Sequence, residues 1–222
     1  TSLRFTVLVH FATVLSTVTV FRKEIADLVR GLFAFSWNPA TRYVAKILLS
    51  MIPVLFIGLF FEEEIERLFT GNLLLVGIAL LVTSGLLFFA SSVRKPGHKR
   101  NIPFSDAFIM GMAQALAVIP GISRSGSTIA TGILLKNQRS EVARFSFLMV
   151  LLPIIGAAML SLRDMDSAST GTDWFPLLAG FIAAYLSGYL ACRWMINIVK
   201  KGKLIWFALY CLAIGTLSMI FA

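Results

Sequence analysis

Residues 120–128 read Pro120-Gly121-Ile122-Ser123-Arg124-Ser125-Gly126-Ser127-Thr128, a polar segment with one fixed positive charge. Apolar runs at 107–119 and 129–135 flank it. Each run is too short to cross a bilayer, because a spanning helix needs about 20 apolar residues. Two short apolar arms joined by a turn predict a re-entrant hairpin, which enters the membrane and returns to the same face. Irregular backbone at membrane depth is tolerated where protein buries it or where it lines a wet cavity. The turn is therefore a candidate site.

The composition is that of an integral membrane protein. The chain has 222 residues, of which 58% are hydrophobic and 14% are charged. A soluble domain is usually about 45–50% apolar and about 25% charged. The net charge of +9 would suggest a nucleic-acid partner in a soluble protein. Here the basic residues lie between apolar runs, so membrane topology explains them better than nucleic-acid binding. Cys192 and Cys211 lie inside apolar runs and are interpreted as packing residues, not as a disulfide or metal site.

Six apolar runs predict an all-α fold of about six transmembrane helices around the re-entrant hairpin. They cover residues 5–21, 43–61, 73–93, 145–162, 175–199 and 204–222. Residues 24–33, after the first run, have the helical spacing of an amphipathic helix on the membrane surface. The loops after the first, third and fifth runs are basic, and those after the second and fourth are acidic. Because basic loops face the cytoplasm, this topology satisfies every loop.

The same pattern predicts an inverted repeat within a single transmembrane domain, residues 1–222. Residues 104–222 hold the hairpin and spans four to six, and residues 1–103 hold spans one to three in the opposite orientation. An inverted repeat would place another hairpin before the first span. Since the chain begins at Thr1 and not at Met, we expect that first hairpin to precede it.

The residues of the turn suit an anionic ligand. Pro120 and Gly121 end the first arm, and Ser123 or Ser125 can cap the second. A capped helix start offers free N–H groups and the positive end of the helix dipole, which together bind anions. Arg124 adds a planar donor group suited to phosphate oxygens. At the entry to the first arm, Ser105 is a candidate N-cap, and Asp106 suits the positive end of that helix.

Further hydroxyl donors are Ser127 and Thr128, and Gly126 allows close approach of the backbone to a ligand. Such small polar residues also serve as packing contacts between membrane helices, so each hydroxyl is equally open to either interpretation. Gln114 is likewise open between helix contact and ligand contact. Arg124 favours function, because a charge at membrane depth costs at least about 2.5–3.5 kcal/mol. The apolar arms favour an anionic head group on a hydrocarbon chain as the ligand.

Residues 114–128 resemble the Pro-Gly-x-Ser-Arg-Ser-x-x-Thr signature of the bacterial undecaprenyl-pyrophosphate phosphatases, the bacitracin-resistance family. Residues 145–148 and the spacing of the spans fit that family too. The resemblance implies an inner-membrane hydrolase that converts undecaprenyl diphosphate into undecaprenyl phosphate, the carrier lipid of peptidoglycan and cell-wall synthesis. It also implies that the active site opens toward the periplasm. The implied catalytic residues are Arg124, Ser123, Ser125 and Thr128, and the implied substrate-binding residues are Gly121, Gly126, Ser127 and Gln114.

This sequence departs from the family in one respect. The family carries an earlier motif, rich in Glu and ending in Ser-Thr-Gly-His, which supplies carboxylates for a divalent cation. This chain has no such motif, and its eleven acidic residues lie in loops or at span ends, none beside Arg124. The resemblance therefore implies Mg²⁺ or Ca²⁺ with ligands expected before Thr1, and no metal ligand in this chain. We expect the chain alone to hold half of the site.

Two other functions fit parts of the pattern. A transporter or flippase for a polyprenyl phosphate could use the same fold and cation. A lipid phosphatase of the acid-phosphatase type needs a His after its Arg, and none follows Arg124. The expected partners are a polyprenyl diphosphate and membrane lipids, with no nucleic acid, and the sequence also allows a homodimer.

Overall fold

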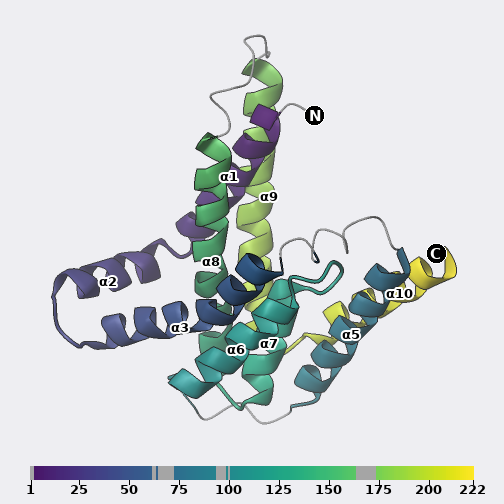
Figure 1. Cartoon of the computed structure of the whole chain (residues 1–222), viewed down its shortest axis with the longest axis horizontal. Helices are drawn as coiled ribbons and strands as arrows, with labels where there is room; N and C mark the ends of the chain where they lie inside the picture. The colour runs from purple at the N-terminus through teal and green to yellow at the C-terminus, as the bar shows by residue number, and fades with distance from the viewer. Residues whose placement is uncertain (1–2, 62–63, 65–72, 94–98, 100, 164–173) are drawn as a thin grey trace. The chain divides into compact units, whose positions relative to one another are not determined.

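The structure is a computed structural model that describes residues 3–61, 64, 73–93, 99, 101–163 and 174–222. These residues are predominantly helical, and none of them belongs to a strand longer than an isolated bridge. The all-α prediction is confirmed. The helices are α1 Leu3–Val20, α2 Arg22–Phe33, α3 Pro39–Phe60, α5 Leu73–Ser92, α6 Phe104–Leu116, α7 Arg124–Leu134, α8 Arg139–Arg163, α9 Trp174–Lys200 and α10 Ile205–Ile220 (Figure 1).

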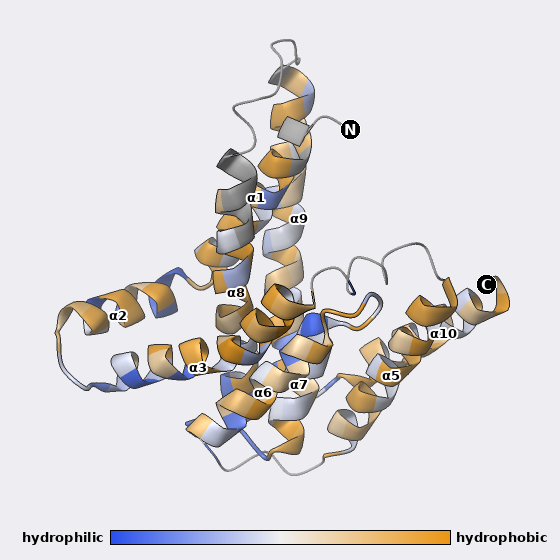
Figure 2. Ribbon diagram, in the orientation of Figure 1, coloured by the Kyte–Doolittle hydropathy of each residue, from blue (hydrophilic) through white to orange (hydrophobic). Residues whose placement is uncertain are grey.

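Each of the six apolar runs forms a helix. Among the described residues, three helical stretches are long and apolar enough to cross a membrane, namely Pro39–Phe60, Leu73–Ser92 and Phe175–Lys200. Val7–Val20 and Ile205–Ile220 are shorter apolar helices. Figure 2 shows α5 and α10 coloured as hydrophobic along almost their whole length. The chain is a membrane protein.

The chain divides into two compact units. One contains Thr1–Thr41 and Val150–Asn197, and the other contains Arg42–Met149 and Ile198–Ala222. The re-entrant hairpin lies in the second unit.

In the first unit, α1 and α9 pack with small residues at their contact. Gly188 lies against Ser16, where a Cβ atom would come within 2.6 Å of the Ser16 hydroxyl oxygen. The Tyr185 hydroxyl donates to the Thr19 hydroxyl at 3.2 Å. The amphipathic helix is confirmed as α2, which has no buried residue. Cys192 of this unit and Cys211 of the second unit are free cysteines.

In the second unit, α5 and α10 run antiparallel in close contact. A Cβ atom on Gly215 would lie 3.0 Å from the carbonyl oxygen of Gly77. Further along, the Ser84 hydroxyl donates to the carbonyl of Ala208 at 2.7 Å. The small side chains let the two backbones approach closely, as is common between membrane helices. The α5 helix also packs against α7 of the hairpin.

The hairpin consists of α6 and α7, which pack against each other. At 1.5 Å per residue, their 13 and 11 residues span about 20 and 16 Å, well short of the roughly 30 Å of bilayer hydrocarbon. The predicted second arm was 129–135, but α7 begins five residues earlier. Most of the polar segment therefore lies in the first turn of α7 and not in the loop.

The predicted N-cap of the first arm is wrong. Pro103 holds that position with an extended backbone, and its carbonyl accepts a hydrogen bond from Ala107 N–H at 3.0 Å. Ser105 is the second residue of α6, where its hydroxyl donates to the Asp106 carboxylate at 3.3 Å. A proline can begin a helix here because the first N–H groups have no helical acceptor in any case.

Candidate active site

The loop between α6 and α7 passes close to α5, and Gly121 makes this passage fit. Its φ is +91°, in the left-handed region that favours glycine. A Cβ atom at this position would lie 2.7 Å from the carbonyl oxygen of Val76 and 2.9 Å from the Cβ of Ala79. Any other residue would strain the turn and push the hairpin away from α5.

Ser123 is the N-cap of α7, one of the two caps that the sequence left open. Its hydroxyl accepts a hydrogen bond from Gly126 N–H at 3.1 Å, and its carbonyl accepts from Ser127 N–H at 2.8 Å. Its own N–H donates to the Thr83 hydroxyl of α5 at 3.2 Å. Thr83 in turn donates to the carbonyl of Ala79 at 3.0 Å, so α5 fixes the start of α7.

The start of α7 leaves donors open. With Gly126 and Ser127 bonded to Ser123, the N–H groups of Arg124 and Ser125 have no acceptor among the described residues. The side chain of Arg124 is exposed and forms no ion pair with any described residue. The Ser125 hydroxyl also lacks a hydrogen bond within the described part of the chain. Two N–H groups, a hydroxyl and a guanidinium thus belong to one helix start, which suits an anion.

The next two predicted residues, Ser127 and Thr128, are buried at 2% and 0% exposure. The Thr128 hydroxyl is 3.0 Å from the carbonyl of Arg124 and 3.2 Å from that of Ser125, so it donates back into its own helix. The Ser127 hydroxyl has no partner among the described residues. The Thr128 hydroxyl therefore stabilises the first turn of α7, whereas the buried Ser127 hydroxyl has no hydrogen-bond partner among the described residues.

Gln114, in the last turn of α6, is 1% exposed, and neither of its side-chain polar atoms has a partner among the described residues. Leaving a buried amide unpaired costs about 1–3 kcal/mol. The structure forms no hydrogen bond between Gln114 and Ser127. Seven of the eight predicted site residues thus lie between 121 and 128 at one end of the hairpin, with Gln114 close before the loop.

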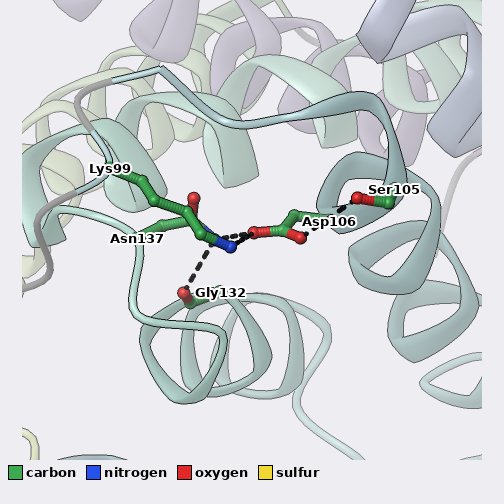
Figure 3. Close-up of polar contacts among 5 residues, drawn as sticks. All are labelled: Lys99, Ser105, Asp106, Gly132 and Asn137. Atoms are coloured by element: carbon green, nitrogen blue, oxygen red, sulfur yellow. Dashed lines mark hydrogen bonds and ion pairs between the residues drawn. The ribbon is translucent and has the colours of Figure 1, made fainter.

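The one buried acid of the hairpin, Asp106, lies in the first turn of α6, at the other end of that helix from the loop. Its carboxylate accepts from Lys99 Nζ at 2.8 Å and from the Asn137 side-chain amide at 2.8 Å (Figure 3). It is therefore already paired and does not balance Arg124. No group of three or more His, Cys, Asp or Glu residues that could hold a metal ion occurs among the described residues.

The contact of Thr83 with Ser123 was not predicted. The only signal for it is a polar residue in the middle of an otherwise apolar span. The Asp106 cluster was missed for the same kind of reason, since Lys99 and Asn137 approach it from separate loops.

Comparison with known proteins identifies the family. The family described as bacitracin resistance protein BacA matches residues 1–217. The undecaprenyl-diphosphatase of Bacteroides fragilis is 53% identical over 222 residues, which cover 99% of this chain and 83% of that protein. Those of Christiangramia forsetii and Carboxydothermus hydrogenoformans are 49% and 36% identical over 221 and 223 residues. These matches cover 100% and 98% of this chain, and 83% and 82% of the two relatives. The chain therefore belongs to the bacitracin resistance protein BacA family.

Proposed function

We propose that this chain belongs to a phosphatase that hydrolyses undecaprenyl diphosphate to undecaprenyl phosphate and inorganic phosphate. Its BacA family membership and its undecaprenyl-diphosphatase relatives support this activity. The observation in the structure that carries the proposal is the start of α7. There an exposed Arg124 and two N–H groups with no acceptor among the described residues lie in the first turn of an otherwise largely apolar helix. A lipid with a diphosphate head group has a negative charge that matches Arg124 and the N–H donors, and a hydrocarbon chain that matches the apolar residues of the hairpin.

The roles follow from the geometry. In phosphoryl transfer most of the catalysis is positioning and stabilisation of charge on the phosphoryl oxygens. Arg124 would bind the diphosphate and stabilise the transferring group, and the N–H groups of Arg124 and Ser125 would bind phosphate oxygens. The Ser123 hydroxyl accepts one hydrogen bond as the cap and still has its own proton to donate. The Ser125 hydroxyl likewise has a proton to donate. Thr128 would act by holding the first turn of α7.

Four other residues would shape the surroundings of the head group. Gly126 has no side chain to block approach to the helix start, where a Cβ atom would lie 2.9 Å from the Ser123 hydroxyl oxygen. Ser127 and Gln114 would offer buried polar atoms that have no partner among the described residues. Gly121 keeps the loop in place against α5.

The resemblance of residues 114–128 to the family signature implies Mg²⁺ or Ca²⁺. The residues at the start of α7 are hydroxyls, N–H donors and a guanidinium, whereas these hard cations prefer carboxylate and carbonyl oxygens. The described residues therefore do not fit such a cation, and the roles given above do not use one.

We place the protein in the bacterial inner membrane with the hairpin entering from the cytoplasm. Lys99 and Lys136 lie beside the base of the hairpin, Lys200 ends α9, and Lys201 and Lys203 lie between α9 and α10. Basic segments of this kind face the cytoplasm. The start of α7 with Arg124 is then directed away from the cytoplasm, which supports a site open to the periplasm.

Replacing Arg124 tests the proposed function in the complete protein. We expect Arg124→Ala to lower phosphate release from undecaprenyl diphosphate at least 100-fold, since loss of one such donor typically costs 10²- to 10³-fold. Arg124→Lys should retain part of the activity, because it keeps the charge and loses the planar pair of donors. Arg193→Ala, which removes another exposed arginine, should leave the rate unchanged.

All three variants should insert into the membrane and melt within a few degrees of the unmodified protein. Phosphate release by Arg124→Ala within threefold of the unmodified protein would defeat the proposal.

A further inference from the structure

A second group of cations lies in the second unit, outside the candidate active site. The guanidinium of Arg144, on α8, is 5.1 Å from the ring centroid of Tyr43 on α3. One turn further along α3, Lys46 Nζ is 5.4 Å from the ring centroid of Phe104, the first residue of α6. Both cations are half-buried. Aromatic faces attract cations, so the two rings hold these charges in place.

These cations have no counter-ion among the residues that the structure describes. Arg42 lies four residues before Lys46 on the same face of α3, and the two positive charges repel each other. Within the described residues, neither they nor Arg144 forms an ion pair. Glu141, one turn before Arg144 on α8, does not pair with it. The Nε of Arg144 is buried and has no acceptor among the described residues.

Membrane topology alone does not explain this arrangement. The cations that mark the basic side, such as Lys136, Lys200 and Lys201, are exposed. Lys46 and Arg144 are instead packed against aromatic rings. Arg42 is also the fourth residue of α3, near the positive end of its dipole, where an anion is favourable and a cation is not. The cluster therefore has the charge, the donors and the dipole for an anion.

We propose that Arg42, Lys46 and Arg144 form a second binding site, for a phosphate group, at the opposite end of the hairpin from Arg124. Phe104 and Leu116 are the first and last residues of α6, and a helix of this length separates them by about 18 Å. The site is thus too far from the start of α7 to share one diphosphate with it. The guanidinium of Arg144 supplies the planar donor geometry that suits phosphate oxygens.

The surroundings favour a phosphate carried by a lipid. Phe104, Phe108 and Met112 follow one another at helical spacing on the exposed face of α6, at 41%, 40% and 47% exposure. A hydrocarbon chain can lie along this face while its phosphate is bound by Lys46. The site would then take a lipid phosphate monoester, the chemical class of the product of the proposed reaction. Inorganic phosphate shares the head-group chemistry without the chain.

A binding measurement on protein that carries Arg124→Ala tests this site separately from the candidate active site. The probes are farnesyl phosphate and inorganic phosphate, titrated against purified protein in detergent. We expect farnesyl phosphate to bind the Arg124→Ala protein, and adding Lys46→Gln with Arg144→Gln to weaken that binding at least tenfold. The matched control, Lys200→Gln with Lys201→Gln in the same background, removes equal charge from exposed positions and should change binding less than twofold.

The outcomes separate the sources of the ligand. Binding of farnesyl phosphate that excess inorganic phosphate does not displace assigns the site to a lipid phosphate. Displacement at similar concentrations assigns it to phosphate itself. Equal binding with and without Lys46 and Arg144, or no binding to the Arg124→Ala protein, overturns the proposal. Because no turnover is measured, this result does not depend on the outcome for the proposed function.

A milder variant keeps the test valid if the double substitution unfolds the protein. Arg42 is exposed, so Arg42→Gln should preserve the fold, as a melting curve would confirm. We expect it to weaken farnesyl phosphate binding at least threefold in the Arg124→Ala background. Unchanged binding in this folded variant would also count against the site.

Discussion

Ser123 determines how the candidate active site is arranged, because it fixes where α7 begins. By capping at 123 and not at 125, it places Arg124 and Ser125 in the first turn, with their N–H groups open. The sequence predicted a serine cap but could not choose between Ser123 and Ser125, since both lie in the same polar segment shortly before the apolar run 129–135. The choice follows from a tertiary contact, the hydrogen bond from Ser123 N–H to Thr83.

Substitutions of Ser123 should separate capping from anion binding. Ser123→Ala removes the cap and should lower the free energy of unfolding by about 1 kcal/mol. Ser123→Asp restores a capping oxygen, so its stability should return to near that of the unmodified protein. Its carboxylate would occupy the positive helix start and repel a diphosphate, so phosphate release should remain at least tenfold reduced. Melting curves and phosphate release measure the two effects, and a fully active Ser123→Asp protein would contradict the assigned anion site.

Gly121 provides a test of the turn itself. Gly121→Ala forces a side chain into a left-handed backbone, at about 1–2 kcal/mol, and places its Cβ against the carbonyl of Val76. We expect a lower melting temperature and reduced phosphate release, because the loop must move away from α5. Gly85→Ala is the matched control, since Gly85 lies inside α5 with open space where a Cβ atom would be added. Equal melting temperatures for the two variants would show that the turn tolerates a side chain.

At the scale of elements, the sequence predicted the hairpin but not what holds its base. The two arms were recognised from their length and from the polar segment between them. Asp106 was interpreted only as a partner of the helix dipole. In the structure it is buried and receives hydrogen bonds from Lys99, before α6, and from Asn137, after α7 (Figure 3). Such a cluster joins residues up to 38 positions apart, so no local pattern predicts it.

Adding a second carboxylate beside Asp106 should destabilise the base of the hairpin. The Asn137 amide also donates to the carbonyl of Gly132 at 3.2 Å, which ties the end of α7 to Asp106. Asn137→Asp replaces that donor with a second carboxylate facing Asp106, and like charges at this distance are strongly unfavourable. We expect the melting temperature to fall markedly at neutral pH and to recover as the pH is lowered and one carboxyl is protonated.

Asn101→Asp serves as the control for this prediction, because Asn101 is exposed near the same helix start. It should leave the melting temperature almost unchanged at both pH values. If Asn137→Asp behaved in the same way, the cluster would not hold the base of the hairpin.

At the scale of the whole molecule, hydropathy predicted the positions of the helices, and hydropathy with loop charge predicted the topology. Each apolar run is a helix, because membrane helices satisfy their backbone hydrogen bonds internally and need little long-range information. Within the second unit, α5 and α10 run antiparallel, as the third and sixth spans should. Each compact unit takes segments from both predicted halves, 1–103 and 104–222. Which helices pack together depends on small contact residues such as Gly77 and Gly215, which periodicity does not reveal. The inverted repeat itself stays a prediction.

The predicted topology can be tested by cysteine labelling of the complete protein in intact bacteria. With Cys192 and Cys211 replaced by alanine, single cysteines are placed at three exposed positions, Glu64, Ser105 and Lys136. A maleimide that does not cross membranes should label the cysteine at 64 in intact cells, because the acidic loop faces outward. It should reach 105 and 136 only after the cells are opened, because both ends of a re-entrant hairpin return to the cytoplasmic side. Labelling of 105 and 136 from opposite sides would mean that α6 and α7 together cross the bilayer, and the start of α7 with Arg124 could not then be a site at the tip of a re-entrant hairpin.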